Sequence, residues 1–294
     1  MSSDHPRRIV LDDRRLLAFD EYGDPDGEPV LSFHGGISSR LDAAPLAESC
    51  QAAGVRLIAP DRPGTGYSDS AAGRALLDWP ADVVELANAL RIERFAVMGW
   101  SLGGQYAAAC AYALPRRVTR AAIVAGVVPF EIAPSRAGMS WADRSLLTFS
   151  RWAPPLASLG LRIAVGAPSV ARLQRAVARD GARADRESMR VDPAPTAMAE
   201  AIKHSIRAGT RGVVSDYRIY GEKWGFDLEQ IDVEVGIWQG DEDTMVPVRD
   251  AELLAERIPR SGLAIRRGEG HISLLRNHCA EIVGWLTARE PARV

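Results

Sequence analysis

The sequence predicts an α/β fold, a mostly parallel β-sheet with helices on both faces and an inserted helical cap. Three observations predict it. Strand-length apolar runs alternate with helix-length amphipathic stretches over residues 1–128. Helical patterns and prolines, without a convincing strand, fill residues 129–228, and strands return within residues 229–294. Parallel strands need crossover connections, usually helices, so this alternation favours a sheet that is covered on both faces.

Composition and charge narrow the class of protein. The chain has 294 residues, of which 47% are hydrophobic and 25% charged, as in ordinary soluble proteins. A formal net charge of −2 gives no electrostatic basis for binding nucleic acid or an acidic membrane surface. The chain contains no stretch of about 18 apolar residues, so we predict no membrane span. The segment Met1–Arg8 is polar, unlike a secretory signal. We therefore expect a cytoplasmic protein without a membrane or nucleic-acid partner, while its oligomeric state stays open.

The three cysteines, Cys50, Cys110 and Cys279, are odd in number and widely spaced. This usage favours free thiols in a reducing compartment over a disulfide framework or a metal site. We accordingly expect no bound metal.

The first half of the chain alternates strands with helices. Strands are expected at Arg8–Leu11, Leu16–Tyr22, Val30–Phe33, Val55–Ala59, Phe95–Met98 and Val118–Ala125, and helices at Leu41–Ala53, Trp79–Leu90 and Gln105–Ala113. The turn residues Asp12 and Asp13 join the first two strands, and Gly54 ends the first helix. Asp78 is the expected N-cap of the second helix, with Pro80 in its first turn.

The second half holds the insert and the remainder of the sheet. Strands are expected at Val233–Gln239 and Leu263–Arg266, and helices at Arg249–Arg257 and Ile272–Thr287. The insert contains Trp141, Trp152 and Trp224, which we expect to form its own core rather than to line a pocket.

The insert is also the positive part of the chain. Residues 131–227 contain fifteen basic and ten acidic residues, so this segment carries +5 and the remainder −7. A positive cap over a negative core could attract anionic substrates. The simpler interpretation, which we favour, is that arginines at helical spacing, such as Arg172, Arg175 and Arg179, face solvent.

The stretch Gly99–Gly104, with the sequence GWSLGG, lies between an apolar strand and an alanine-rich helix. In that strand–turn–helix setting, a G-x-S-x-G pattern predicts a serine held on a strained turn and presented above the sheet. Gly99 and Gly103 would remove the Cβ atoms that collide there. Ser101 is therefore the candidate nucleophile, and the Leu102 N–H points into the same space.

A serine nucleophile needs a base, and the base needs a group that orients it. Of the five histidines, only His271 combines a glycine loop, a strand end and a position late in the chain. Three carboxylates crowd the loop Gly240–Pro247. We choose Asp243, because the residues after it turn the chain into the next helix, and expect Asp241 to cap the turn. Glu131 is the next candidate acid.

Together these motifs resemble those of the α/β-hydrolase superfamily, and in particular its capped serine esterase and haloperoxidase-like branch. The matching motifs are His34-Gly35-Gly36, Asp61–Ser68, Gly99–Gly104 and the pair Asp243 with His271. They span nearly the whole core, in the family's order of serine, acid and histidine. The insert carries no motif of this kind.

The resemblance implies roles for these residues. Ser101 would be the nucleophile, His271 the general base and then acid, and Asp243 the carboxylate that orients it. The backbone N–H groups of Leu102 and Gly36 would form the oxyanion hole, although many relatives carry a bulkier residue than glycine at position 36. No cofactor is implied.

Three further residues or motifs lie outside the proposed triad and oxyanion hole. His34 is expected to support the oxyanion loop rather than to act on substrate. The stretch Asp61–Ser68 should form a tight turn, and it does not have the third glycine of a dinucleotide-binding motif. Trp100 either flanks the substrate pocket or packs beneath the turn, and we take it as a substrate-binding candidate.

We therefore predict a serine hydrolase that cleaves an ester, lactone or related acyl bond of a small molecule through an acyl-enzyme. A serine at position 101 argues against the dehalogenases and epoxide hydrolases of this fold, which use aspartate there. A carbon–carbon bond hydrolase, an iminopeptidase, an acyltransferase and a non-enzymatic ligand sensor remain open as alternatives.

Overall fold

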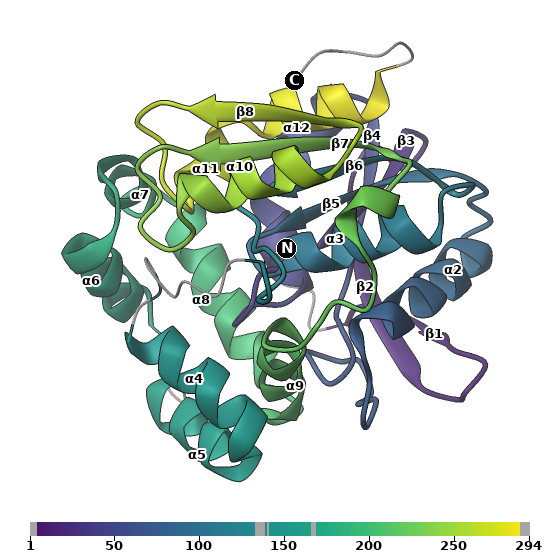
Figure 1. The fold of residues 1–294 in the computed structure, drawn as a ribbon. Helices are drawn as coiled ribbons and strands as arrows, with labels where there is room; N and C mark the ends of the chain where they lie inside the picture. The colour runs from purple at the N-terminus through teal and green to yellow at the C-terminus, as the bar shows by residue number, and fades with distance from the viewer. Residues whose placement is uncertain (1–4, 133–138, 140, 166–168, 289–294) are drawn as a thin grey trace.

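The computed structural model describes residues 5–132, 139, 141–165 and 169–288. It contains an eight-stranded sheet in the order β1-β2-β4-β3-β5-β6-β7-β8 (Figure 1). The strands are β1 (Arg7–Val10), β2 (Leu16–Gly23), β3 (Glu28–Phe33), β4 (Val55–Pro60), β5 (Phe95–Trp100), β6 (Val118–Val124), β7 (Glu234–Gly240) and β8 (Ser261–Arg266). Strands β3 to β8 pair in parallel, and β2 runs antiparallel to both β1 and β4. The predicted mostly parallel α/β sheet is confirmed.

Helices cover both faces of the sheet, as the alternating pattern predicts. The core helices are α1 (Ala47–Ala52), α2 (Trp79–Ala89), α3 (Gly103–Ala113), α10 (Val248–Arg257), α11 (Ser273–Asn277) and α12 (Cys279–Thr287). Side chains such as Leu86, Tyr106 and Leu254 place α2, α3 and α10 against one face. Side chains such as Cys50 and Ile282 place α1 and α12 against the other. All three cysteines are buried and free, as expected.

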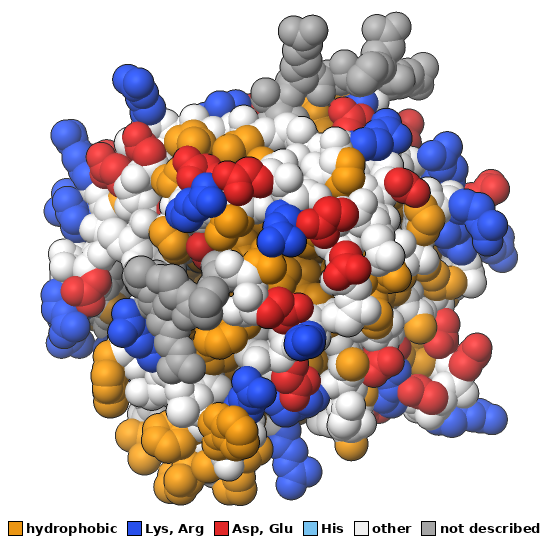
Figure 2. Space-filling model, viewed as in Figure 1, with side chains coloured by type: hydrophobic (Ala, Val, Ile, Leu, Met, Phe, Trp, Pro, Cys, Tyr) orange, Lys and Arg blue, Asp and Glu red, His pale blue; other side chains and the backbone are white. Residues whose placement is uncertain are grey.

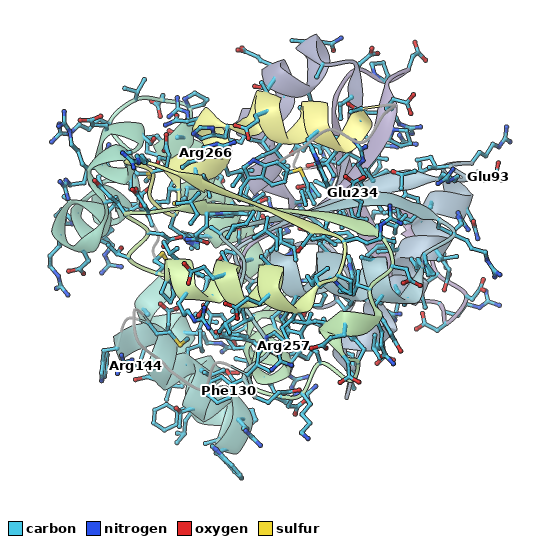
Figure 3. All side chains as sticks on the ribbon, turned by 45° about the horizontal axis from the view of Figure 1, so that its top comes forward. Glu93, Phe130, Arg144, Glu234, Arg257 and Arg266 are labelled. Carbon is cyan, nitrogen blue, oxygen red and sulfur yellow. The ribbon has the colours of Figure 1, made fainter. Side chains whose placement is uncertain are left out.

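A helical insert lies between β6 and β7. Its helices are α4 (Trp141–Trp152), α5 (Pro154–Val165), α6 (Val170–Asp180), α7 (Arg183–Ser188), α8 (Ala194–Ser205) and α9 (Arg211–Tyr220). Arg266, the last residue of β8, lies at the end of the sheet nearest α6 and α7, whereas Glu234, the first residue of β7, lies toward the opposite end (Figure 3). The insert therefore sits as a cap at the edge where the parallel strands end, which is where such sheets bind ligands.

Some predicted helix details are wrong. The stretch Ile272–Thr287 is two helices, because the chain breaks at His278, which separates α11 from α12. The stretch Leu41–Ala53 begins as a 3₁₀ segment, η1 (Arg40–Leu46), before α1. Asp78 occupies the N-cap position of α2, as predicted, but its side chain makes no cap hydrogen bond there; its carboxylate instead accepts the Ala75 N–H at 2.8 Å, in the short turn before that helix.

The expectation that the insert's tryptophans form its core is wrong for two of the three. Trp224 is 1% exposed, but Trp141 and Trp152 are 83% and 75% exposed. They lie on α4, beside exposed apolar side chains of α5, and this apolar surface gathers along the lower edge of the view in Figure 2. Hydrophobic periodicity marks a side chain as apolar, whereas its burial depends on whether another element packs over it.

The cap helices also bear on two other expectations. The arginines at positions 172, 175 and 179 are exposed on α6, in agreement with the interpretation that they face solvent. Within the described residues, no single helix is long and apolar enough to cross a membrane, although α5 and α6 together pass that test as a bent pair.

Candidate active site

Ser101 occupies a strained turn between β5 and α3. Its φ is +56°, in the left-handed region that side chains other than glycine rarely adopt. The turn is tight, since a Cβ at Gly99 would lie 2.1 Å from the Gly103 carbonyl oxygen, and one at Gly103 would lie 2.1 Å from that of Phe33. Glycine is therefore required on both sides of the serine. This geometry is the one that the G-x-S-x-G pattern predicts.

His271 and Asp243 form a buried pair. The His271 Nδ1 lies 2.8 Å from Asp243 Oδ2, and the two side chains are 3% and 0% exposed. Asp243 Oδ1 also accepts the backbone N–H groups of Met245 and Val246, at 2.8 and 2.9 Å. The amide Nε2 of Gln239 donates to Oδ2 at 3.0 Å. With both oxygens bonded, the carboxylate is fixed in position and presents Oδ2 to the imidazole.

The pair shifts both of its own pKa values. Burial alone would lower the pKa of His271, but the charge and hydrogen bond of Asp243 outweigh it, so the pKa lies above its ordinary value. Burial alone would raise the pKa of Asp243, but the His271 charge and the hydrogen bonds to Asp243 lower it overall. Asp243 is thus a carboxylate near neutral pH, and it stabilises the imidazolium form of His271.

The other acids considered from the sequence lie elsewhere. The carboxylate of the exposed Asp241 accepts the N–H of Gly268, 27 positions away, at 2.7 Å, so it joins two loops and the expectation that it caps its own turn is wrong. Glu242 and Glu131 are exposed, and neither is hydrogen-bonded to His271. Of the candidate acids, the structure brings Asp243 to the histidine.

A cavity of about 270 Å³ lies between the core and the cap. Ser101, Leu102, Gly36 and His271 line it from the core, and cap side chains, including Tyr217, close it from the other side. Within the described part of the chain, Ser101 Oγ makes no protein hydrogen bond. Catalytic hydrogen bonds are often long before substrate binds, so the shared cavity is the relevant relationship between Ser101 and His271.

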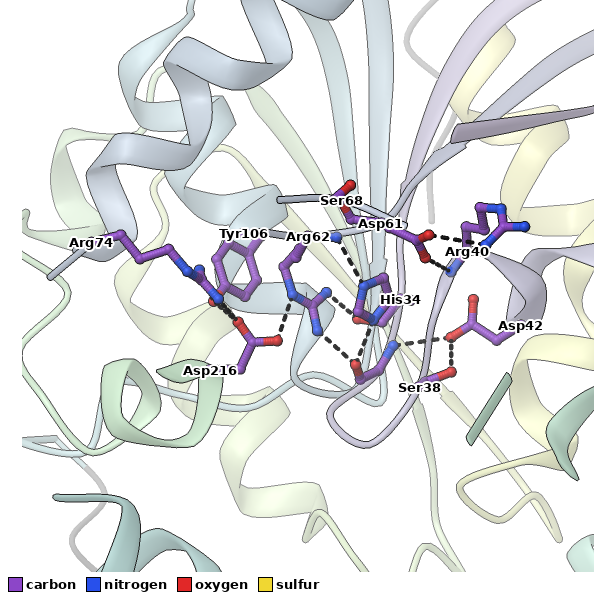
Figure 4. Close-up of polar contacts among 11 residues, drawn as sticks. His34, Ser38, Arg40, Asp42, Asp61, Arg62, Ser68, Arg74, Tyr106 and Asp216 are labelled. Carbon is purple, nitrogen blue, oxygen red and sulfur yellow. Dashed lines mark hydrogen bonds and ion pairs between the residues drawn. The ribbon is translucent and has the colours of Figure 1, made fainter. Parts of the chain in front are cut away.

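The backbone around Gly36 is held from behind by Arg62. The Arg62 guanidinium donates to the carbonyl oxygens of His34 and Gly35, the latter at 2.7 Å (Figure 4). In a trans peptide the C=O and N–H point in opposite directions, so the Gly36 N–H points away from Arg62. Neither this N–H nor that of Leu102 is bonded to an acceptor among the described residues.

Glycine at position 36 has a steric reason. A Cβ there would lie 3.0 Å from the Tyr217 hydroxyl, which reaches over this loop from α9 of the cap. That hydroxyl donates to Asp143 at 3.0 Å. Tyr217 therefore takes the space that a larger side chain at position 36 would need.

His34 lies behind the loop rather than in the cavity. Its Nε2 accepts the backbone N–H of Arg62 at 3.2 Å. Nδ1 therefore carries the proton and donates to the Gly35 carbonyl oxygen at 2.9 Å. Burial, reinforced by the Arg62 charge, holds the pKa of His34 well below its ordinary range. A neutral, fully engaged imidazole supports the loop, in agreement with the structural role expected for it.

A second acid, Asp42, supports the same loop from the cavity side. Its Oδ2 accepts the Gly35 N–H at 3.0 Å and the Ser38 hydroxyl at 2.9 Å (Figure 4). Burial raises the pKa of Asp42 to about 6, and hydrogen bonds only partly offset this effect. The residue also lines the cavity.

Trp100 lies between the cavity and the loop that carries His271. It lines the cavity. Its indole N–H also donates to the carbonyl oxygen of His271 at 3.0 Å, and the two ring centroids are 5.3 Å apart. Trp100 therefore holds the histidine loop while it borders the space for substrate.

The sequence interpretation missed several of these supports. Gln239 had one local signal, because it is a polar amide directly after the apolar run Val235–Trp238 of its strand. Asp42, Asp185 and Asp216 had none, since each is an ordinary acid within a helical stretch. Their partners are distant in the sequence, so only the folded chain shows what they contact.

Comparisons with known proteins identify the family to which this fold belongs. Residues 28–277 match the family model described as alpha/beta hydrolase fold. The chain is 28% identical to a non-heme chloroperoxidase of Streptomyces lividans, over 86% of this chain and 90% of that protein. It is 36% identical to a putative carbamate hydrolase, RutD, of Variovorax paradoxus, but this match spans 37% of the chain and only 41% of that protein. Among solved structures, an esterase of Exiguobacterium antarcticum superposes with a TM-score of 0.70 at 19% identity, covering 96% of this chain and 100% of that chain.

Proposed function

This chain belongs to the α/β-hydrolase fold family, and we propose that it is a serine hydrolase that cleaves an ester, lactone or related acyl bond of a small molecule. The observation that carries the proposal is the cavity in which Ser101, on its strained turn, faces the same space as His271, which is paired with Asp243 behind it. A sheet with a helical cap supplies a scaffold, whereas this constellation supplies a nucleophile, a base and an orienting acid.

The first step forms an acyl-enzyme. Ser101 Oγ attacks the acyl carbonyl carbon while its proton moves to His271 Nε2. Asp243 keeps the other ring nitrogen, Nδ1, protonated, so that Nε2 is the free base, and it stabilises the imidazolium that forms. His271 then gives the proton to the leaving oxygen as the carbon–oxygen bond breaks.

The Gly36 and Leu102 N–H groups are the proposed oxyanion hole. Both residues line the cavity with Ser101, and both N–H groups are free of described protein acceptors. Donors aimed at the developing charge are worth roughly 3–4 kcal/mol each in comparable enzymes. Arg62 and Asp42, which bond the peptide groups around Gly35, keep this loop in place.

Water completes the cycle. It attacks the acyl carbon and gives a proton to His271, and this proton returns to Ser101 Oγ as the acyl-enzyme bond breaks. The products are a carboxylic acid and the alcohol released earlier, or a hydroxy acid from a lactone.

The cavity favours a substrate that is small, mostly apolar and not anionic. Its cap wall includes Val177, Met198 and Ile202. The described lining holds no arginine or lysine but includes Asp42 and Asp250. A buried anionic group beside these carboxylates would be repelled.

A fluorophosphonate probe tests the proposal, together with a panel of esters and lactones that varies in acyl chain length. The wild-type protein should be labelled once and should turn over at least one member of the panel. Ser101→Ala should abolish labelling and reduce turnover by about 10⁶, the loss seen for the nucleophile of a comparable triad. Labelling that survives this substitution contradicts the assignment, and labelling without turnover of any ester or lactone favours a ligand sensor or another serine-dependent reaction.

A further inference from the structure

Asp185 joins the cap to the histidine loop of the core. It lies on α7, in the cap, and is 2% exposed. Its Oδ2 accepts the His271 N–H at 3.0 Å, and its Oδ1 accepts the N–H groups of Ile272 and Ser273 at 2.9 and 2.8 Å. One cap carboxylate thus binds three consecutive N–H groups, the first of which belongs to the proposed catalytic base.

The chain leaves room for this carboxylate at Gly270. A Cβ at that position would lie 2.4 Å from Asp185 Cγ and equally close to Oδ2. The glycine before His271 therefore has a second function beyond loop flexibility, because any larger residue would push the Asp185 carboxylate away. Gly270 and Asp185 are 85 positions apart in the chain, yet a Cβ at the first would collide with the carboxylate of the second.

His271 is consequently held at three points. Its N–H is bonded to Asp185 of the cap, its carbonyl oxygen to the Trp100 indole N–H, and its Nδ1 to Asp243 Oδ2. The last two partners belong to the core, so Asp185 is the anchor that the cap supplies. The Nε2 atom is the ring nitrogen left for Ser101 and substrate.

We propose that Asp185 is a positioning residue for His271, so that the catalytic base is correctly placed only while α7 of the cap is docked on the histidine loop. This inference rests on the proposed hydrolase function. An error of about 1 Å in the placement of a catalytic group can cost roughly a hundredfold in rate, so the loss of one anchor should be measurable.

A purely structural alternative is that Asp185 only attaches the cap. A second contact between the same helices allows the two to be separated. Arg276, on α11, donates to the Ser188 carbonyl oxygen of the cap at 3.0 Å without touching His271. Arg276→Ala therefore weakens the docking of α7 while leaving the His271 N–H bonded, and it is the matched control. Glu187→Gln, an exposed carboxylate on α7, controls for the charge change.

Two substitutions of Asp185 remove different numbers of its hydrogen bonds to the histidine loop. Asp185→Asn can keep the two bonds made by Oδ1, but its amide replaces the acceptor of the His271 N–H. Asp185→Ala loses all three bonds. We expect kcat on the best ester to fall about tenfold for Asn and about a hundredfold for Ala, with KM little changed. Labelling of Ser101 by a fluorophosphonate should slow in parallel.

The titration of His271, followed by NMR, gives a readout that requires no substrate. The Asp185 charge is among the influences that raise the pKa of His271, so this pKa should fall in both Asp185 variants. Neither control should change it. Thermal unfolding identifies any variant that fails to fold, and the Asn variant preserves the test if the Ala variant does not fold.

The outcomes separate this inference from the function on which it rests. A wild-type protein that neither labels nor turns over any ester contradicts the proposed hydrolase. An active wild type, with unchanged kcat and His271 pKa in Asp185→Ala, overturns the positioning role alone. Equal losses in Asp185→Ala and Arg276→Ala also overturn it, in favour of simple attachment of the cap.

Discussion

Asp216 on α9 of the cap and Arg62 of the core form a fully buried ion pair, with Nε and Oδ2 2.9 Å apart. Asp216 also accepts hydrogen bonds from Arg74 and from the Tyr106 hydroxyl, the latter at 2.7 Å (Figure 4). Arg62 in turn holds the carbonyl oxygens of the oxyanion loop. One cap carboxylate is thus linked to the proposed oxyanion hole, just as Asp185 is linked to the proposed base.

The first prediction concerns this pair. Asp216→Asn leaves the buried guanidinium groups of Arg62 and Arg74 without a counter-charge, so the free energy of unfolding should fall by about 3–5 kcal/mol. Urea denaturation measures the change. Glu187→Gln, which removes an exposed pairing with Arg183, should change stability by less than about 0.5 kcal/mol and is the control. Equal, small effects of the two substitutions would show that Asp216 is not a stabilising ion-pair partner.

The same pair predicts an effect of acid on stability. Burial raises the pKa of Asp216, but the charges of Arg62 and Arg74 outweigh it and lower the pKa to about 2, below the ordinary value of 3.8. The stability that ionised Asp216 contributes is therefore complete above pH 3.8 and is lost as the pH falls through about 2. Denaturation midpoints measured across this range should decline more steeply in the wild type than in Asp216→Asn.

The second residue to test is the acid of the proposed triad. Asp243→Asn replaces the carboxylate that fixes the His271 tautomer, and the same change in a serine protease costs roughly 10⁴ in kcat. The protein should still fold, because the substituted amide is of similar size. Asp241→Asn and Glu242→Gln alter exposed loop residues and should each cost less than tenfold, or about 1.4 kcal/mol. If Asp241→Asn were the damaging change, the loop would be misassigned.

The pH dependence of kcat/KM should report His271. The neutral imidazole is the form that accepts the Ser101 proton, and the pKa of His271 lies above its ordinary value of 6.5. Activity on a neutral ester should therefore rise with pH through a midpoint above 6.5. The Asp243 charge is the main cause of this raised pKa, so the residual activity of Asp243→Asn should rise through a lower midpoint. A wild-type midpoint below 6.5 would contradict the proposed role of the pair.

The charge of the cavity leads to a prediction about substrate preference. Asp250 lines the cavity and its side chain has no described hydrogen-bond partner; burial, together with the Asp243 charge, raises its pKa to about 6. At pH 8 this carboxylate is ionised, so an ester with an anionic acyl group should have a kcat/KM about tenfold lower than its neutral isostere. Asp250→Asn should narrow that gap.

Salt provides the control for this comparison. If the exposed arginines of α6 steered anionic esters toward the cavity, kcat/KM for the anionic ester would exceed that for its neutral isostere at low salt and fall as salt is added. We expect the anionic ester to be the poorer substrate at every salt concentration. A higher kcat/KM for the anionic ester at low salt would instead show that the positive charge of the cap contributes to substrate specificity.

Local patterns in the chain were enough to predict the class of sheet, the position of the insert and the candidates Ser101, Asp243 and His271. These features are encoded locally. Periodicity distinguishes strands from helices, and a strained serine turn needs small neighbours such as Gly99 and Gly103 within a few residues. The order of the motifs along the chain, serine then acid then histidine, linked these separate local patterns into one predicted site.

The contacts between the cap and the core could be seen only in the folded chain. Asp185 and Asp216 lie in helical stretches that carry no recognisable motif. Asp185 bonds His271, 86 positions away, and Asp216 bonds Arg62, 154 positions away. Burial is likewise a property of packing, which is why Trp141 is exposed although its sequence context favoured a core position. A carboxylate becomes a structural anchor only when folding removes it from water and brings N–H groups or guanidinium groups to it. Because those groups come from distant parts of the chain, a local sequence pattern does not predict the contact.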